Sequence, residues 1–216
     1  VVNAFNLRMA GGEQHVQIEM GSIVQERFTF LDFFVPGIIG LTIMTTCVFN
    51  VQGTISRYRA NGIFRKLATT PMTPFEWLLS RILWHLFISF LTLAVIMGFG
   101  VLIFGMNMSV NLPVVLMIVA GSAMFSALGM MVARFVKNEE TASMAANAIT
   151  FPMMFLSGTF FQLEMMPSYL QQIAAVLPLT YMSQGLRDAM VYDNLAGAYF
   201  NLAVVAVIGV MFVIVA

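Results

Sequence analysis

The residue types that could carry covalent chemistry are few in this chain and stand far apart. A serine beside a glycine, Ser157-Gly158, could act as a nucleophile if a histidine base took its proton. The two histidines, His15 and His85, are both expected in other segments, and His85 lies toward the opposite end of its own apolar run. The sequence contains no His-Glu-x-x-His zinc motif. We therefore do not favour an intramembrane serine protease, and we expect Ser157-Gly158 to ease a helix break.

The sequence also lacks the residues for nucleotide binding and for ion coupling. The only lysines, Lys66 and Lys137, do not follow the glycine spacing of a phosphate-binding loop. The apolar segments carry no Asp, Glu or Lys near their centres, whereas a carrier coupled to protons or sodium ions needs such groups. We expect no catalytic residue, metal or cofactor in this chain. If ATP and Mg²⁺ drive the protein, a separate subunit binds and hydrolyses them.

One short stretch, residues 54–71, holds four of the ten basic residues of the chain. Apolar side chains recur at helical spacing from Ile55 to Leu67, and the basic side chains occupy the remaining face. This pattern predicts one amphipathic helix at the membrane interface, with Gly62 as a weak point and Pro71 beyond its end. Two interpretations stay open: the helix anchors to acidic headgroups, or it docks a soluble partner. The basic residues are Arg57, Arg59, Arg65 and Lys66.

The overall composition is that of a membrane protein. Of the 216 residues, 60% are hydrophobic and only 9% are charged, whereas soluble domains carry about 25% charged residues. So few charges cannot cover so apolar a core in water, which makes lipid the solvent. The net charge of zero gives no reason to expect a nucleic acid partner. Five stretches are long and apolar enough to be spanning helices: residues 33–51, 77–104, 112–136, 141–161 and 198–216.

The positions of Lys and Arg predict the orientation in the cell (plasma) membrane. The loop 52–76 and the connection that carries Arg134 and Lys137 are basic, so the positive-inside rule makes both cytoplasmic. Residues 1–31 are then predicted to be an extracytoplasmic loop, and residues 32–216 to be the multi-pass transmembrane domain. Because a chain that begins outside without a signal peptide needs an upstream span, we expect a fragment of a longer subunit with six spans.

A shorter amphipathic segment, residues 167–178, follows the fourth predicted span. Its length of about 12 residues is too short to cross a bilayer. We expect a re-entrant or interfacial helix on the outer side, followed by a second amphipathic piece at residues 181–192. A re-entrant helix suggests the mouth of a pathway, although a plain interfacial helix fits equally well. The residues expected to shape this exit region are Pro152 (which should kink the fourth span), Ser157, Gly158, Pro167, Pro178 and Tyr181.

Polar residues inside the predicted spans could line a pathway. Thr42, Thr45 and Thr46 lie on the first span, but such threonines more often hydrogen-bond to their own helix. Asn147 on the fourth span is expected to be buried and to bond a neighbouring helix. Small residues recur at i, i+4 in the third and fourth spans, and we favour close packing within one subunit over a dimer seam. They are Gly121, Ser122, Ala123, Ser126, Ala127, Gly129, Ala142, Ala146 and Thr150.

Several motifs, in order along the chain, resemble those of ABC type-2 transporter permeases. Phe33-Phe34-Val35-Pro36-Gly37 resembles the start of a span in that family, and Arg59-x-x-Gly62 followed by Leu67-x-x-Thr70-Pro71 resembles its cytoplasmic pattern. The resemblance covers residues 30–216 or so. The family's C-terminal signature is matched by Phe155-Leu156-Ser157-Gly158-Thr159-Phe160-Phe161, Met166-Pro167, Pro178-Leu179-Thr180-Tyr181 and Leu186-Arg187.

The resemblance implies an all-α, polytopic membrane bundle, with five spans in this fragment, an outer re-entrant helix and a cytoplasmic amphipathic coupling helix. It implies a permease that forms a homodimer or heterodimer and pairs with an ABC ATP-binding subunit to export a substrate, which we expect to be amphipathic or lipid-like. The alternative is a non-transporting membrane assembly or anchoring protein. The residues that the resemblance assigns to ATPase coupling are Arg57, Arg59, Gly62, Arg65, Lys66, Leu67 and Pro71.

Overall fold

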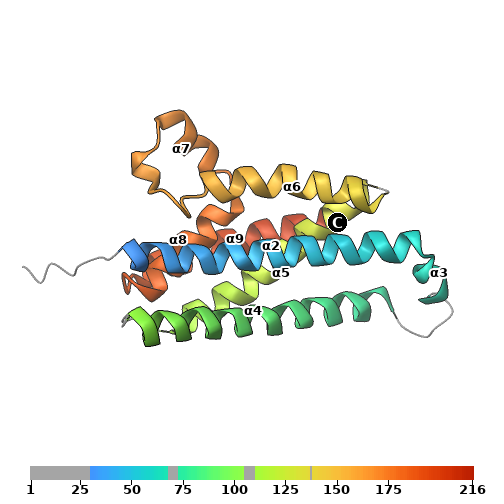
Figure 1. The fold of residues 1–216 in the computed structure, drawn as a ribbon, viewed down its shortest axis with the longest axis horizontal. Helices are drawn as coiled ribbons and strands as arrows, with labels where there is room; N and C mark the ends of the chain where they lie inside the picture. Colours follow the sequence, from blue (N-terminus) through green and yellow to red (C-terminus); the bar gives the residue numbers. More distant parts are fainter. Residues whose placement is uncertain (1–29, 68–72, 105–109, 137) are drawn as a thin grey trace, which may run out of the picture.

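The computed structural model describes residues 30–67, 73–104, 110–136 and 138–216, which form helices joined by turns (Figure 1). Of the predicted outer loop, residues 1–29 lie outside this part of the chain. In order, the elements are α2 (Phe30–Ala60), α3 (Ile63–Leu67), α4 (Pro74–Phe104), α5 (Leu112–Phe135), α6 (Glu139–Leu156), the 3-10 turn η1 (Leu163–Met165), α7 (Ser168–Ala174), α8 (Pro178–Met190) and α9 (Leu195–Val215).

Four of the described helices are long and apolar enough to cross a membrane. They are Asp32–Ala60, Leu79–Ile103, Leu112–Phe135 and Leu195–Val215, which correspond to the first, second, third and fifth predicted spans. The predicted all-helical membrane architecture is therefore confirmed. The fourth predicted span forms α6, which has 18 residues and two acidic residues in its first turn, and α6 is not one of the four.

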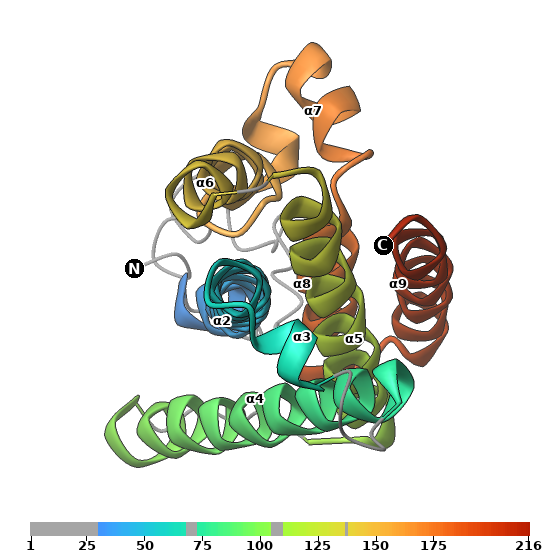
Figure 2. The ribbon, with the colours of Figure 1, turned by 90° about the vertical axis from the view of Figure 1, so that its right-hand side faces the viewer.

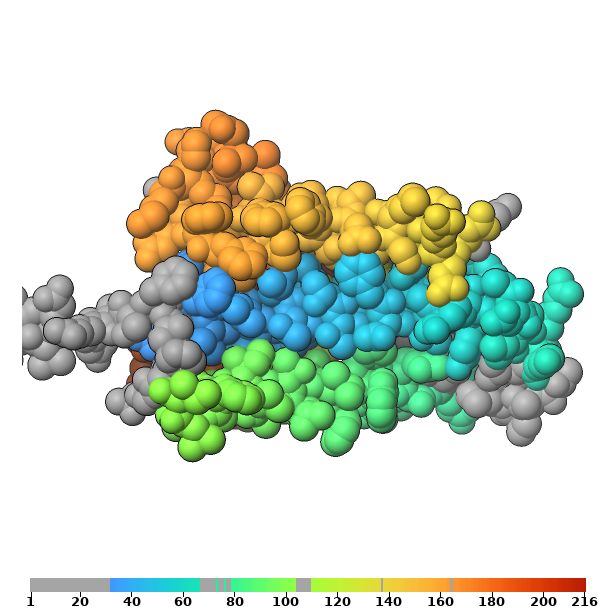
Figure 3. All heavy atoms as spheres, viewed as in Figure 1, coloured from blue at the N-terminus to red at the C-terminus, as the bar shows by residue number. Residues whose placement is uncertain are grey.

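The helices α2 and α5 form the centre of the bundle. In the end-on view of Figure 2, α4 and α6 lie on opposite sides of α2, and α9 lies beyond α5. Figure 3 shows side chains of α6 and α4 against α2 along its length. The core is apolar, and large side chains that are exposed in the described residues, such as Leu83, Phe87 and Leu91 of α4, suit contact with lipid.

The small-residue face of α5 lets this helix pack directly against the backbone of α2. A Cβ atom on Gly129 would lie 2.8 Å from the carbonyl oxygen of Val48. Ser122 and Ser126 on the same helix are buried, and on α6 Ala142 and Ala146 are buried as well. The prediction that these faces pack within one subunit is confirmed, because such close approach requires small residues.

The prediction of one amphipathic helix across residues 55–67 is wrong. α2 continues without a break to Ala60, so the first half of the basic stretch is the end of a spanning helix. The chain then turns at Asn61-Gly62, where Gly62 has φ 65°. The rest of the predicted helix is the five-residue helix α3. Glycine ends helices readily because it adopts this left-handed conformation without a Cβ clash, so the predicted weak point is the place of the break.

The end of the bundle opposite α3 also differs from the prediction. α6 ends at Leu156, and Gly158 has φ 74°, so the expected helix break at Ser157-Gly158 is confirmed. The predicted helix at 167–178 is shorter, because α7 ends at Ala174, and Pro178 begins α8 instead of ending α7. A proline suits the first helical position because its missing N–H would have had no partner there. Most of the predicted piece at 181–192 belongs to α8, which ends at Met190 and is mostly buried.

Candidate functional site

Two arginines of the basic stretch are held against other helices of the same chain. Arg57 Nε lies 3.7 Å from Glu139 Oε1 at the start of α6, with both side chains well exposed. Arg59 Nη1 donates to the carbonyl oxygens of Ala133 at 2.9 Å and of Val136 at 3.0 Å. Ala133 lies in the last turn of α5 and Val136 is its C-cap residue, where carbonyls lack partners within the helix. Arg59 therefore caps α5, a role that the sequence did not predict.

A second contact joins α2, α3 and α4 at this end. Arg81 Nη2 donates to the hydroxyl of Tyr58 at 2.7 Å, and the guanidinium carbon lies 5.4 Å from the centre of the Tyr58 ring. The Tyr58 ring packs edge-on against Phe64, with their centres 5.9 Å apart. Tyr58 at the end of α2 therefore contacts both α3 and the start of α4. A displacement of α3 would be transmitted through it to both of the longer helices.

The remaining basic residues of the predicted coupling set point outward from α3. Arg65 and Lys66 are exposed, and both lie in the last turn of this helix. Leu67 is its final residue, and Pro71 lies outside the described residues. The four basic residues of the predicted coupling set thus divide into a pair that contacts other helices, Arg57 and Arg59, and an outward pair on α3, Arg65 and Lys66.

The residues predicted to line a pathway lie on α2 and α6, and three of them bond their own helix. Thr42 Oγ1 donates to the Ile38 carbonyl at 2.8 Å, and Thr45 Oγ1 to the Leu41 carbonyl at 3.0 Å, so both bond their own helix. Thr46 is half-buried on the same helix. The prediction for Asn147 is wrong: its side chain is exposed and donates to the Ser143 carbonyl of its own helix at 3.0 Å.

The reason for the error at Asn147 is the orientation of α6. The side of α6 that packs in the bundle carries the small residues Ala142 and Ala146 together with Thr150. Asn147 follows Ala146 by one position, which turns its side chain about 100° away from that contact. A polar residue on the outer side of the helix can then bond only its own backbone or groups outside this chain.

The end of the bundle opposite α3 contains a buried arginine, which the sequence predicted as part of a motif but without a role. Arg187 on α8 is only 5% exposed. Its Nε donates to the Phe33 carbonyl at 3.0 Å, and its Nη2 donates to the Gly158 carbonyl at 2.6 Å. Its guanidinium carbon lies 3.7 Å from the centre of the Phe33 ring. One side chain thus joins α8, the start of α2 and the turn after α6. The available signal was that residues 162–197 contain one basic residue.

Glycines and hydroxyl groups make room for this arginine. A Cβ atom on Gly37 would lie 3.1 Å from Arg187 Nη2, so a larger residue there would press on the guanidinium. The positive φ of Gly158 turns its carbonyl toward Arg187. Ser157 Oγ lies 2.9 Å from Thr159 Oγ1, so this serine bonds a threonine of the same turn. This arrangement gives Ser157 a structural role in the turn.

The expected exit residues lie around this turn and contribute to helix ends. Pro152 lies inside α6, Pro167 precedes the first residue of α7, and Pro178 is the first residue of α8. The Tyr181 hydroxyl donates to the Ala175 carbonyl at 2.6 Å, which holds α7 against α8. The expected exit residues therefore shape the backbone.

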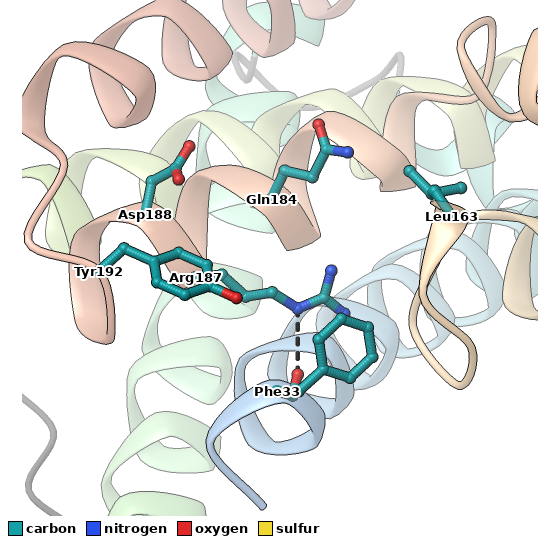
Figure 4. Close-up of a pocket in the computed structure, with 6 residues that line it drawn as sticks. All are labelled: Phe33, Leu163, Gln184, Arg187, Asp188 and Tyr192. Atoms are coloured by element: carbon teal, nitrogen blue, oxygen red, sulfur yellow. Dashed lines mark hydrogen bonds between the residues drawn. The ribbon is translucent and has the colours of Figure 1, made fainter. Parts of the chain in front are cut away.

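A pocket of about 250 Å³ opens beside Arg187 (Figure 4). Asp188 in its wall accepts a hydrogen bond through Oδ2 from Asn201 of α9 at 3.0 Å. Burial raises the pKa of the Asp188 carboxyl, while the bond from Asn201 and the charge of Arg187 act in the opposite direction. The lining residues are Phe33, Leu163, Gln184, Arg187, Asp188 and Tyr192.

A buried hydrogen bond joins two of the candidate spanning helices, α4 and α5. Ser122 Oγ of α5 donates to Ser89 Oγ of α4 at 3.0 Å, and Ser89 in turn donates to the His85 carbonyl at 2.8 Å. Across the described residues, no group of three His, Cys, Asp or Glu side chains is placed to hold a metal ion. The described geometry therefore offers helix contacts, a basic surface and a small pocket.

Comparison with known proteins places this geometry in context. A family model described as "ABC-2 family transporter protein" matches residues 14–216. The chain is 26% identical over 185 residues to "Probable multidrug ABC transporter permease YbhS" of Escherichia coli (strain K12), covering 84% of this chain and 47% of that protein. It is 24% identical over 165 residues to "Inner membrane transport permease YadH" of the same strain, covering 74% of this chain and 62% of YadH.

A third relative comes from another organism. "Nodulation protein J" of Rhizobium leguminosarum bv. viciae is 24% identical over 188 residues, covering 83% of this chain and 70% of that protein. The chain spans about half the length of YbhS and less than two thirds of YadH. The similarity thus covers most of this chain and a smaller part of the two Escherichia coli proteins.

Proposed function

The chain belongs to the ABC-2 family of transporter permeases, and from this membership we propose that it is the membrane-spanning part of an exporter driven by a separate ATP-binding subunit. Permeases of this family carry no catalytic site of their own, which agrees with the absence of a phosphate-binding loop from the sequence. ATP and Mg²⁺ would then be bound by the partner. The proposed substrate is amphipathic or lipid-like, and the proposed assembly is a homodimer or heterodimer of permeases.

The observation that carries this proposal is the outward basic pair on α3. Arg65 and Lys66 are exposed next to the end of α2. The 31 residues of α2 give a helix of about 46 Å. At its other end, Phe33 is bound by Arg187. A displacement of α3 by an ATPase would therefore act on a continuous helix that reaches the outer turn.

We further propose that α6 also crosses the membrane, which gives five spans in all. Its 18 residues give a length of about 27 Å, close to the hydrocarbon thickness of about 30 Å. It runs beside α2 in Figure 1, and its small residues face the bundle. The acidic first turn, Glu139 and Glu140, would then lie in the headgroup region on the cytoplasmic side, near Arg57.

The location that we propose is the plasma membrane, with residues 1–31 outside and the loop 52–76 in the cytoplasm. The basic content of that loop supports this orientation. The relative YadH carries the name of an inner membrane protein, which supports the same location. In this orientation, α7 and the Arg187 pocket would lie on the outer side, where α7 is the proposed re-entrant helix.

The proposed coupling surface can be tested by charge reversal. Arg65→Glu with Lys66→Glu should reduce co-purification with the ATP-binding subunit and its stimulated ATPase activity about tenfold or more, since buried or partly buried charge pairs at interfaces are worth at least that factor. The matched control, Arg65→Lys with Lys66→Arg, keeps both charges and should bind normally. Unchanged binding and stimulation in the reversed variant would refute the docking role of α3.

A second measurement separates transport from a purely architectural role. Liposomes that contain the permease and its ATPase should show ATPase activity that rises when an exported compound is added. A non-transporting assembly or anchoring protein predicts a basal rate that no added compound changes. Arg59 is unsuitable as the test residue for either experiment, because its loss would also uncap α5.

A further inference from the structure

One wall of the pocket beside Arg187 is polar and comes from α8 and the turn that follows it. Gln184, Asp188 and Tyr192 follow one another at i, i+4 and i+8, and all three line the pocket. They are partly or fully exposed, whereas ten of the 13 residues of α8 are buried. An otherwise buried helix that presents an amide and a carboxylate one turn apart, with a phenol in the turn that follows the helix, is suited to a polar ligand.

Two opposite charges stand in this wall at fixed positions. The Arg187 guanidinium is held by the carbonyls of Phe33 and Gly158 and by the Phe33 ring. The Asp188 carboxylate is held through Oδ2 by Asn201 of the neighbouring helix. Its second oxygen has no hydrogen-bond donor among the described residues, so a ligand can bind it. A ligand that carries both a positive and a negative group would match both charges.

The depth of the pocket points to a headgroup. Phe33 is the second residue of the candidate span Asp32–Ala60, and Tyr192 precedes the candidate span Leu195–Val215 by three positions. Two independent spans therefore place the pocket where the hydrocarbon layer ends and polar headgroups begin. Its volume of about 250 Å³ equals roughly eight water molecules, below the 300 Å³ or so at which pockets for drug-sized ligands begin.

We propose that this pocket binds the zwitterionic headgroup of a phospholipid that carries a primary ammonium and a phosphodiester, as in phosphatidylethanolamine. The ammonium donates to Asp188, and the phosphodiester lies between the Gln184 amide and the positive charge of Arg187. Figure 4 shows the ends of Gln184 and Arg187 extending to the same side of the pocket, toward Leu163. The acyl chains then continue along the lipid-facing side of the bundle.

The chemistry of the wall distinguishes this headgroup from the common alternatives. A primary ammonium offers three hydrogen-bond donors to the carboxylate, as a lysine does, whereas the trimethylated ammonium of phosphatidylcholine offers none. Phosphatidylglycerol lacks a positive group, so nothing in its headgroup would offset the repulsion between its phosphodiester and the Asp188 carboxylate. The preference should therefore run from phosphatidylethanolamine to the other two lipids.

The test compares lipids on the purified protein in detergent, with binding followed by native mass spectrometry. Phosphatidylethanolamine should bind about tenfold more tightly than phosphatidylcholine or phosphatidylglycerol with the same acyl chains, since a hydrogen bond to a charged group is worth that factor or more. The Asp188→Asn variant can still accept the hydrogen bond from Asn201. Its affinity for phosphatidylethanolamine should fall to that for the other two lipids. Equal binding of all three lipids to the unaltered protein would overturn the proposal, as would an unchanged preference in Asp188→Asn.

A matched control lies in the turn that follows. Asp193 is exposed, has φ 49° and does not line the pocket, so Asp193→Asn removes the same charge from a nearby site with a residue that tolerates this conformation. It should leave the preference intact. Gln184→Ala removes the contact to the phosphodiester and should weaken the binding of all three lipids by a similar factor. A loss of binding for one lipid alone would contradict the assigned orientation.

The source of the headgroup is tested by competition with soluble glycerophosphoethanolamine. It should displace the bound lipid only at a large excess, because it has no acyl chains to hold it at the membrane surface. Displacement at equal concentration would assign the pocket to a soluble zwitterion and overturn the lipid assignment. None of these measurements uses ATP or the ATPase, so a failure here is separate from a failure of the proposed transport function.

Discussion

Arg187 contacts Phe33 in two ways at once, although the two residues are 154 positions apart in the chain. Its Nε donates to the Phe33 carbonyl at 3.0 Å, and its guanidinium carbon lies 3.7 Å from the centre of the Phe33 ring. The same side chain donates to the carbonyl of Gly158 at 2.6 Å. A planar guanidinium can bind two acceptors and stack on a ring together, so this one residue fixes three segments relative to each other.

Removal of Arg187 should destabilise the bundle. Arg187→Met keeps the apolar stem but leaves the buried carbonyls of Phe33 and Gly158 without their donor, and we expect a loss of about 2–5 kcal/mol. Arg187→Lys should restore only part of it, because an ammonium lacks the planar fork. Thermal unfolding of the purified protein in detergent measures both. A melting temperature for Arg187→Met equal to that of the unaltered protein would contradict this role.

The orientation can be tested with two cysteines introduced into a chain without its native one. Cys47 is buried, so Cys47→Ala provides the background. Asn61→Cys and Ser168→Cys are both exposed positions, and Asn61 is preferred to Gly62 because a cysteine would be strained at φ 65°. A membrane-impermeant maleimide should label Ser168→Cys from outside intact cells and Asn61→Cys only after permeabilisation. If both cysteines were labelled from the same side, the proposed topology, in which α2 ends on one side of the membrane and α6 on the other, would be wrong.

The hydrogen bond between Ser89 and Ser122 should contribute a small, measurable coupling between α4 and α5. Ser89→Ala, Ser122→Ala and the double variant form a cycle, and polar contacts within membrane bundles average about 0.6 kcal/mol with a maximum near 1.7. Each single variant should unfold at a lower temperature, and the double variant should lose less than the sum. Strictly additive losses would show that the two hydroxyls do not interact.

The sequence predicted those features that depend on local chemistry. Gly158 was expected to ease a helix break and Gly62 to be a weak point within a helix, and both have positive φ in turns that end helices. The repeated small residues around Gly129 were expected to allow close packing, and the backbone of Val48 lies against them. In each case the cause lies in the residue itself, namely in a missing or small side chain.

The features that the sequence did not predict depend on contacts between distant segments. Arg59 caps α5 only because the end of α2 lies beside the end of α5, and the basic pattern alone was equally consistent with a lipid or partner contact. Asn147 faces outward because α6 presents its small residues to the bundle, which a single helix cannot reveal. The Arg187 site forms only where α8, the start of α2 and the turn after α6 come together. These segments are far apart in the sequence, so their proximity cannot be predicted from local patterns.

The start of α4 supplies a last prediction, which concerns acid pH. Thr73 and Glu76 form a reciprocal cap: the Thr73 backbone N–H donates to Glu76 Oε2 at 2.8 Å, and the Glu76 N–H donates to Thr73 Oγ1 at 3.2 Å. The hydrogen bonds from the backbone and the side chain of Thr73 hold the pKa of Glu76 below its usual value. Because the carboxyl is more acidic in the folded state, its stabilising effect is present above the unfolded pKa and is lost as the pH falls through the folded one.

Hydrogen exchange of the first-turn amides of α4, corrected for the intrinsic rate at each pH, should therefore show protection that fades below about pH 4. Glu76→Gln keeps an acceptor at the same position, so it should retain part of the protection and lose its pH dependence. Thr73→Ala should lower the protection at every pH, because the Glu76 N–H loses its acceptor. An acid-dependent loss of the same size in Glu76→Gln would mean that another group titrates, and Glu76 would then not be the residue that stabilises the helix start nearest to α3.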